Sequence, residues 1–210
     1  MSSRTSPYRW LAGALALVVA TAFVTTQVFS EDPPQGQPKM TPEEQKTFEA
    51  CMKAAIPGPQ HKQLVSIAGT WDVATTFWMK PDAPPSPSTG VTKAKAILGD
   101  RWIMEEFEGQ MMGGPFGGLG ITGYDNVKKK YVNIWMDTMG TGAMISEGTS
   151  DATGKIITYI GTYEDPATNK TKTYRSISKF ISDSKHTFEM YDKTPEGKEF
   201  KCLDIVYTRK

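Results

Sequence analysis

Apolar and polar residues alternate with a period of two from Thr70 to the C-terminus, a pattern typical of strands that bury one face. Clusters of Gly, Asp, Asn, Pro and Ser interrupt the alternation and divide it into ten stretches. The predicted strands lie at about residues 70–79, 90–98, 101–109, 118–124, 130–138, 142–149, 155–163, 171–181, 185–192 and 198–208.

The connections between these stretches are short and have the composition of hairpin turns, as at Gly99-Asp100, Asp125-Asn126 and Asp183-Ser184. Short connections place successive strands side by side and antiparallel. A meander of ten strands avoids two exposed edges most simply by closing on itself. We therefore predict an all-β fold, a single antiparallel up-and-down β-barrel of about ten strands formed by residues 69–210.

A helical segment over residues 41–68 is predicted before the barrel. Thr41 has the character of an N-cap, Pro42 suits the first helical position, and Glu44 completes a capping box. The apolar positions that share one helical face are Phe48, Cys51, Met52, Ala55 and Ile56. We expect this face to pack against the barrel wall or to cover one end of the barrel. A second, short helical turn is expected from His61 to Ala68.

Residues 1–30 have the composition of an export signal. Arg4 and Arg9 form a basic start, Trp10 to Val24 is apolar, and small residues allow cleavage after Ser30. This pattern predicts a protein that is exported to the periplasm or the cell exterior.

The alternative is an uncleaved membrane anchor formed by residues 10–29, which are just long enough to span a bilayer. Residues 31–40 are rich in proline and polar side chains and are predicted to be a linker. Export to an oxidising compartment permits a disulfide between Cys51 and Cys202. The alternative for this pair is two independent thiols.

Charge and motifs exclude several classes of function. The 24 Lys and Arg residues balance 23 Asp and Glu residues and form no large basic cluster, so no nucleic-acid partner is expected. Residues 118–123 match the GxGxxG pattern of dinucleotide-binding proteins, but a hairpin follows them in place of the required helix. With two His and two Cys residues, a zinc site is not expected either.

Two features at the ends of the predicted barrel resemble the calycins, the class of lipocalin and fatty-acid-binding barrels. Gly69-Thr70-Trp71 opens the first strand and Arg209 closes the last. The resemblance implies that Trp71 and Arg209 pack together and tie the two strands at the closed end of the barrel.

A longer resemblance covers nearly all of the chain after the linker. The stretches that carry it are PGPQHKQLVSIAGTWDV, MMGGPFGGLGITGYDNVKKKYVNIWMDTMGTG and SKHTFEMYDKTPEGKEFKCLDIVYTRK. They are similar to the bacterial family known as domain of unknown function 1579. This resemblance implies no activity, substrate or catalytic residue.

The predicted fifth strand supplies a candidate ligand-binding wall. Tyr131, Asn133 and Trp135 alternate on one face, and a mixed aromatic and polar wall suits a small amphipathic ligand. The alternative is that the aromatic side chains fill a solid core.

The glycine-flanked loop at residues 111–118 is a candidate flap over the ligand. Met111, Met112 and Phe116 would give it a soft, mobile apolar surface. The alternative is a loop that folds down and plugs the mouth of the barrel.

Charged residues of the predicted strands are candidates for chemistry inside the barrel. Glu105 is a candidate inward-facing carboxylate, and Arg175 is a candidate partner because a buried acid needs a cation or donors. The alternative is that both lie on solvated outer faces. His186 shares a face with Phe188 and Met190, so haem with His186 as axial ligand is an alternative to a protein without a cofactor.

Three functions are compatible with these features. The leading hypothesis is an exported protein, not an enzyme, that binds a small apolar or amphipathic molecule inside the barrel. The second is an enzyme that acts on such a ligand through an inward carboxylate such as Glu105, with Arg175 or Tyr124. The third is a structural or interaction protein whose barrel is filled by its own side chains.

Overall fold

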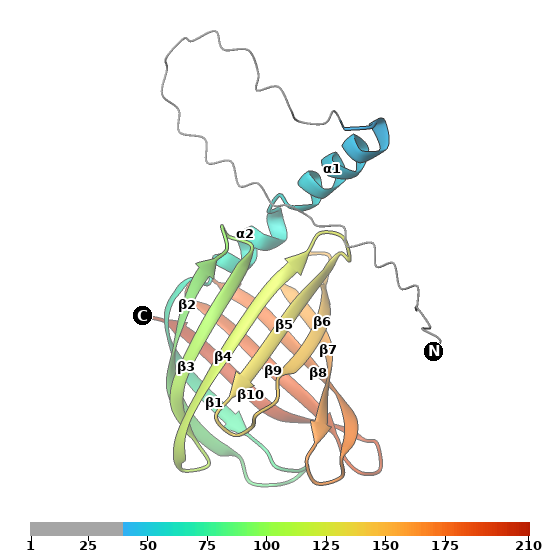
Figure 1. Cartoon of the computed structure of the whole chain (residues 1–210). Coiled ribbons are helices and arrows are strands. Elements are labelled where there is room, and N and C mark those ends of the chain that lie inside the picture. The colour runs from blue at the N-terminus through green and yellow to red at the C-terminus, as the bar shows by residue number, and fades with distance from the viewer. Residues whose placement is uncertain (1–39) are drawn as a thin grey trace, which may run out of the picture. The chain divides into compact units, whose positions relative to one another are not determined.

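The structure is a computed structural model that describes residues 40–210, and it contains two helices followed by ten strands (Figure 1). The predicted signal or anchor segment, residues 1–30, and all but the last residue of the predicted linker lie outside the described residues. The helices are α1 (Pro42–Ala54) and α2 (Pro59–Val65). Neither of them has the length and apolarity that a membrane-spanning helix needs.

The ten strands form one closed antiparallel barrel in which every strand pairs with its neighbours in sequence and β1 pairs with β10. This confirms the predicted fold class. The strands are β1 (Gly69–Phe77), β2 (Ser86–Ile97), β3 (Trp102–Met111), β4 (Gly114–Asp125), β5 (Lys130–Asp137), β6 (Met144–Ser150), β7 (Ile156–Asp165), β8 (Lys170–Ser182), β9 (Lys185–Lys193) and β10 (Glu199–Arg209).

The seam between the first and last strands begins at Trp71, whose Cα is paired with that of Arg209. The resemblance to calycins implied this juxtaposition. The indole Nε1 of Trp71 donates a hydrogen bond of 2.8 Å to the carbonyl of Ile67, in the segment that links α2 to β1. The seam is therefore tied to the segment that precedes the barrel.

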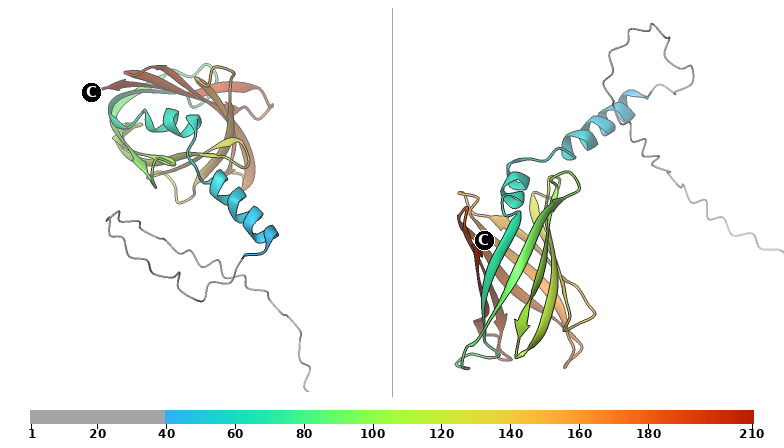
Figure 2. Two further views of the ribbon diagram at one scale, coloured as in Figure 1. Left: turned by 90° about the horizontal axis from the view of Figure 1, so that it is seen from above. Right: turned by 90° about the vertical axis from the view of Figure 1, so that its left-hand side faces the viewer.

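Helix α2 closes one end of the barrel and lies within the ring of strands when the molecule is viewed from above (Figure 2). Its Leu64 belongs to the buried core, and its His61 accepts a hydrogen bond of 2.9 Å from the amide of Gly58 at the start of the helix. The buried core lies at this closed end and consists of Leu64, Ile67, Trp71, Ala94, Ile103, Tyr131, Ile157 and Tyr159.

Helix α1 has the predicted capping box, in which Thr41 and Glu44 exchange hydrogen bonds, but it buries no residue. The expectation that its apolar face packs on the barrel is wrong, since Phe48 and Met52 are each more than half exposed. Hydrogen bonds from the barrel hold the C-terminal end of the helix. Arg101 and Asn126, from two turns of the barrel, donate hydrogen bonds to carbonyls of residues 54–56.

Candidate functional site

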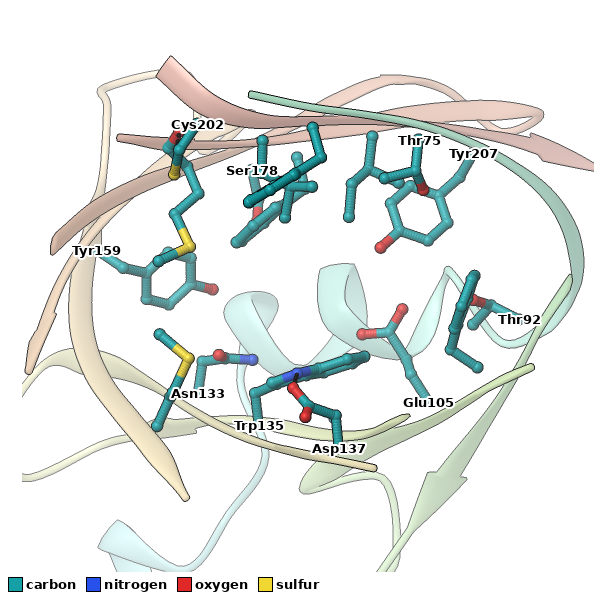
Figure 3. A pocket seen from close by; sticks show the side chains of 18 of the residues that line it. Thr75, Thr92, Glu105, Asn133, Trp135, Asp137, Tyr159, Ser178, Cys202 and Tyr207 are labelled. Carbon is teal, nitrogen blue, oxygen red and sulfur yellow. Dashed lines mark hydrogen bonds between the residues drawn. The ribbon is translucent and has the colours of Figure 1, made fainter. Parts of the chain in front are cut away.

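The interior of the barrel holds a cavity of about 370 Å³ between the core at the closed end and the opposite end, which we call the open end (Figure 3). Most of its wall is apolar. Its apolar lining includes Ile103, Phe107, Phe116, Trp135, Phe188, Met190, Phe200, Leu203, Ile205 and Tyr207. Its polar lining includes Thr75, Thr92, Glu105, Thr122, Asn133, Asp137, Ser178 and Asp192. The barrel is thus not filled by its own side chains.

The fifth strand contributes the mixed wall that the alternation predicts. Asn133, Trp135 and Asp137 line the cavity, whereas Tyr131 lies deeper on the same face and belongs to the core. The indole Nε1 of Trp135 donates a hydrogen bond of 2.8 Å to Asp137, and Asn133 donates one of 2.8 Å to Thr122. These bonds fix the orientation of the wall side chains.

The glycines of the GxGxxG stretch make room for tryptophans. A Cβ atom at Gly118 would lie 2.3 Å from the indole of Trp135, and one at Gly120 would lie 3.4 Å from it. Gly123 leaves the same kind of space for Trp102, since a Cβ there would lie 2.4 Å from that ring. The whole stretch lies within β4, so the spacing that resembles a nucleotide motif reflects aromatic packing on a strand.

Glu105 points into the middle of the cavity (Figure 3). Its carboxylate has no hydrogen bond or ion pair with any of residues 40–210, and burial raises its pKa from the ordinary value of 4.5 to about 7. The hydroxyl groups of Tyr159 and Tyr207 also face this space, and burial raises their pKa values as well. The enclosure of this half-buried carboxyl group by the barrel therefore gives Glu105 a pKa near neutrality.

Arg175 is not the partner of Glu105. It lies on the outer face of β8, where its Nε donates a hydrogen bond of 2.9 Å to Glu199 and its guanidinium stacks on Tyr191 at 3.9 Å. The inner face of this strand carries Tyr174, Ser176 and Ser178 instead, because inward and outward positions alternate along it.

Tyr124, the other proposed partner of Glu105, packs in the closed end. Its ring lies 4.9 Å from that of Tyr131 and 5.8 Å from the imidazole of His61. It does not line the cavity that Glu105 faces. Neither residue named beside Glu105 in the enzyme hypothesis is therefore placed to act with it.

The predicted flap is a tight hairpin. Strands β3 and β4 are joined only by Met112 and Gly113, whose φ angles of 53° and 82° are those of a two-residue turn. Met111 and the buried Phe116 line the cavity from the flanking strands, whereas Met112 is exposed at the tip. The glycines indicated a long loop, whereas Gly113 belongs to the turn and Gly118 accommodates Trp135 of β5.

Three methionines at or just after the ends of β1, β3 and β5 surround the open end. Met79 follows β1, Met111 ends β3 and Met139 follows β5, and all three line the cavity. Met79 and Met139 are also largely exposed, so the cavity reaches solvent here. We call these three residues the methionine rim.

His186 lies at the closed end of the cavity between two aromatic rings. Its imidazole stacks on Tyr207 with centroids 4.1 Å apart and meets the edge of Trp71 at 4.5 Å. Burial, with the nearby charge of Arg209, lowers the pKa of His186 to about 4, so the ring is neutral at pH 7. Its Nε2 is buried and has no hydrogen-bond partner among the described residues.

The two cysteines are free thiols. Cys51 is exposed on α1, whereas Cys202 is buried on the cavity wall and donates a hydrogen bond of 3.4 Å to the carbonyl of Met190. The disulfide is therefore not formed, and the alternative of two independent thiols describes the structure. Residues 40–210 hold no cluster of three or more His, Cys, Asp or Glu side chains that could ligate a metal.

Several wall residues were not singled out from the sequence, above all Tyr159 and Tyr207. Each occupies an inward position in the alternation of its strand, but many residues that fill the core do so too. The alternation therefore does not distinguish cavity residues from core residues. A bulge between Lys201 and Leu203 also shifts β10 by one residue, so that both Cys202 and Leu203 line the cavity. Strict alternation would put Val206 on the same face as Cys202, but Val206 does not line the cavity.

A closed ten-stranded meander with one internal cavity and a Trp–Arg pair at its seam defines a calycin-like barrel protein. The sequence profile of the family described as "Protein of unknown function (DUF1579)" matches residues 56–209, and the chain belongs to this family. No curated protein matches the chain significantly.

Solved structures give a similar picture of the fold. The chain is similar to Rv2717c from M. tuberculosis, with 14% identity, a TM-score of 0.56, and coverage of 74% of this chain and 99% of that one. Two further barrels match with lower TM-scores. A redesigned β-barrel, b11L5F_LGL, has 16% identity and a TM-score of 0.36, with coverage of 72% of this chain and 96% of that one. EF1p2_mFAP2b bound to DFHBI has 13% identity and a TM-score of 0.35, with coverage of 72% of this chain and 98% of that one.

Proposed function

We propose that this protein binds a small apolar or amphipathic molecule in the barrel cavity and is not an enzyme. The observation that carries the proposal is the cavity itself, whose volume of about 370 Å³ falls in the range of small-molecule sites, roughly 300–1,000 Å³. Its wall combines many apolar side chains with a few polar ones. The apolar surface supplies affinity, at about 25 cal/mol for each Å² removed from water, and the polar groups select orientation.

The methionine rim suits an entrance for such a ligand. Helix α2 and the core block the closed end, whereas Met79 and Met139 are exposed where the cavity meets solvent. Thioether side chains are unbranched and flexible, so they can open and re-pack around ligands of different shape. This rim takes the role that the sequence had suggested for a flap.

Export remains part of the proposal, because residues 1–30 have the composition of a signal peptide or anchor. The measurement is the N-terminal sequence and mass of the protein recovered from its native host. A chain that begins near Glu31 supports cleavage, an intact chain in the membrane fraction supports the anchor at residues 10–29, and an intact soluble chain in the cytoplasm contradicts export.

The binding proposal is tested by organic extraction of the protein purified from its native host, followed by mass spectrometry. We expect one class of small molecule in near-stoichiometric amount. Ser178→Phe places a ring in the cavity and should reduce the yield, whereas Ile177→Phe, on the other face of β8, should not. An empty extract from the unmodified protein, with no binding of added apolar probes, would contradict the proposal.

Haem is the cofactor alternative, with His186 as the residue that would hold it. The buried Nε2 lacks a partner, but stacking on Tyr207 and contact with Trp71 leave the imidazole enclosed by aromatic side chains. The absorbance spectrum of the purified protein, before and after addition of haem, distinguishes this ligand from others. A Soret band that disappears in His186→Ala would support it.

The enzyme hypothesis has one specific observation in its favour. A pKa of about 7 would allow Glu105 to accept and donate protons at neutral pH. The extracted molecule should be incubated with fresh protein and with Glu105→Gln, and its mass followed over time. Turnover that the variant lacks would replace binding with catalysis as the function.

A further inference from the structure

We infer that the ligand presents a cationic N–H donor, such as a protonated amine, to the carboxylate of Glu105, and an aromatic or apolar body to the rest of the cavity. This inference rests on the proposed binding function and specifies the chemical class of the ligand. Four observations of the cavity support it.

The first is that Glu105 has no partner within the described residues 40–210. The side chain is half-buried, and the surface that it keeps lies against the cavity (Figure 3). No cation or donor of residues 40–210 engages it. Burial of an unpaired carboxylate is costly, and a complementary charge on a ligand is what would offset that cost.

The second is the charge of the wall. Among residues 40–210, the basic residues that line the cavity are Lys179 and His186. Lys179 is already ion-paired with Glu189 at 3.0 Å, and His186 is neutral at pH 7. Neither residue therefore offers an unpaired positive charge to an anionic ligand.

The third is the position of the other acids. Asp137 accepts a hydrogen bond from Trp135, and Asp192 accepts one of 2.9 Å from the hydroxyl of Tyr163. Both line the cavity together with Glu105. The wall therefore disfavours a carboxylate ligand such as a fatty acid, because like charges repel in a medium of low dielectric constant.

The fourth is the indole of Trp135, which lies across Gly120 from Glu105. Trp135 packs over Gly120, and the position of a Cβ on that glycine lies 3.4 Å from the indole and 3.7 Å from the Cβ of Glu105. Glu105 and Trp135 are thus neighbours across Gly120 on the inner face of the sheet, and an indole in that position attracts a cation through its π-system. The aromatic side chains further along the wall suit a flat apolar body.

Three probes with the same two-ring body test the inference: 1-naphthylmethylamine, 1-methylnaphthalene and 1-naphthoic acid. Their dissociation constants are measured by calorimetry near pH 8 with the unmodified protein, Glu105→Gln and Glu106→Gln. Glu106 is exposed on the outer face of the same strand and gives a matched control. Thermal unfolding verifies that each variant is folded.

We expect the amine to bind the unmodified protein at least about tenfold more tightly than the hydrocarbon, and the acid to bind most weakly. Glu105→Gln should abolish the preference for the amine and leave the hydrocarbon affinity within about threefold, while Glu106→Gln should change neither. Equal binding of amine and hydrocarbon, or an amine preference that survives Glu105→Gln, overturns the inference but not the proposed binding. Failure of all three probes to bind counts against both.

Discussion

The guanidinium of Arg209 lies 4.2 Å from the centroid of the Trp71 indole, at the seam where the barrel closes. The same side chain donates hydrogen bonds of 2.7–2.8 Å to the carbonyls of Asp183, Ala68 and Ser66. One residue at the end of β10 thus joins the start of β1, the end of α2 and the turn between β8 and β9. These bonds require the planar fork of arginine, which lysine lacks.

Arg209→Lys should therefore destabilise the barrel by about 1–3 kcal/mol, because three carbonyls lose hydrogen bonds from the guanidinium and the stacking on Trp71 is lost. Urea denaturation measures the difference. Arg175→Lys is the matched control, since its ion pair with Glu199 lies on the outer surface and should contribute less than about 1 kcal/mol. Equal effects of the two changes would show that the seam has no special role.

The alternation of apolar and polar residues in the sequence was sufficient to predict the architecture of the barrel. It predicted ten strands, and the fifth, for example, was expected at residues 130–138 and is found at Lys130–Asp137. The resemblance to calycins, carried by Gly69-x-Trp71 and Arg209, implied the seam, and the structure gives the reason for the glycine. Gly69 has a φ of 139°, and a Cβ there would lie 2.6 Å from the guanidinium of Arg209. The strand pattern could be predicted because the alternation within each strand is a local property of the sequence.

The parts of the site that the sequence did not predict depend on contacts between distant segments. Whether Glu105 meets Arg175 depends on which face of β8 points inward, and that is set by barrel closure. The bulge at Cys202 and the glycine packing around Trp135 likewise involve pairs of strands. The unburied face of α1 has the helical period that usually indicates packing, although nothing in the described part of the chain covers it.

Gly118→Ala should disturb the cavity wall. The added methyl group would lie 2.3 Å from Trp135, so the indole must move, and we expect a loss of about 1–3 kcal/mol in stability with a shift in tryptophan fluorescence. Gly117→Ala is the control on the opposite face of β4, where the nearest atom would be 3.6 Å away. It should alter stability by no more than about 0.5 kcal/mol. Equal changes in both variants would argue against tight packing of Trp135 on the glycine.

The two cysteines should differ in reactivity. A thiol reagent at neutral pH should label Cys51 quickly because it is exposed. Cys202 should react only after unfolding, since burial and the nearby charge of Asp192 raise its pKa to about 11 and thiolates are the reactive form. Mass spectrometry should therefore find one label in the native protein, two in denaturant, and none in native Cys51→Ser. Unfolded protein that takes up no label until it is reduced would reveal a disulfide instead.

The dependence of stability on pH should show two opposing contributions from the cavity. Burial raises the pKa of Glu105 from 4.5 to about 7, so its stabilising contribution is present below pH 4.5 and is lost as the pH rises through 7. Burial lowers the pKa of His186 from 6.5 to about 4, so its contribution is present above pH 6.5 and is lost as the pH falls through 4. The two slopes cancel between about pH 4.5 and 6.5.

Glu105→Gln should therefore expose the slope of His186. The tyrosines beside this pair, Tyr159 and Tyr207, do not titrate in this range, because burial raises their pKa values. The free energy of unfolding of the variant should rise by about 3 kcal/mol from pH 4 to 6.5, and at pH 8 it should exceed that of the unmodified protein by a similar amount. Urea denaturation across this range measures both quantities. A variant whose stability follows that of the unmodified protein at every pH would mean that Glu105 is solvated, and the case for a charged partner in the cavity would lose its basis.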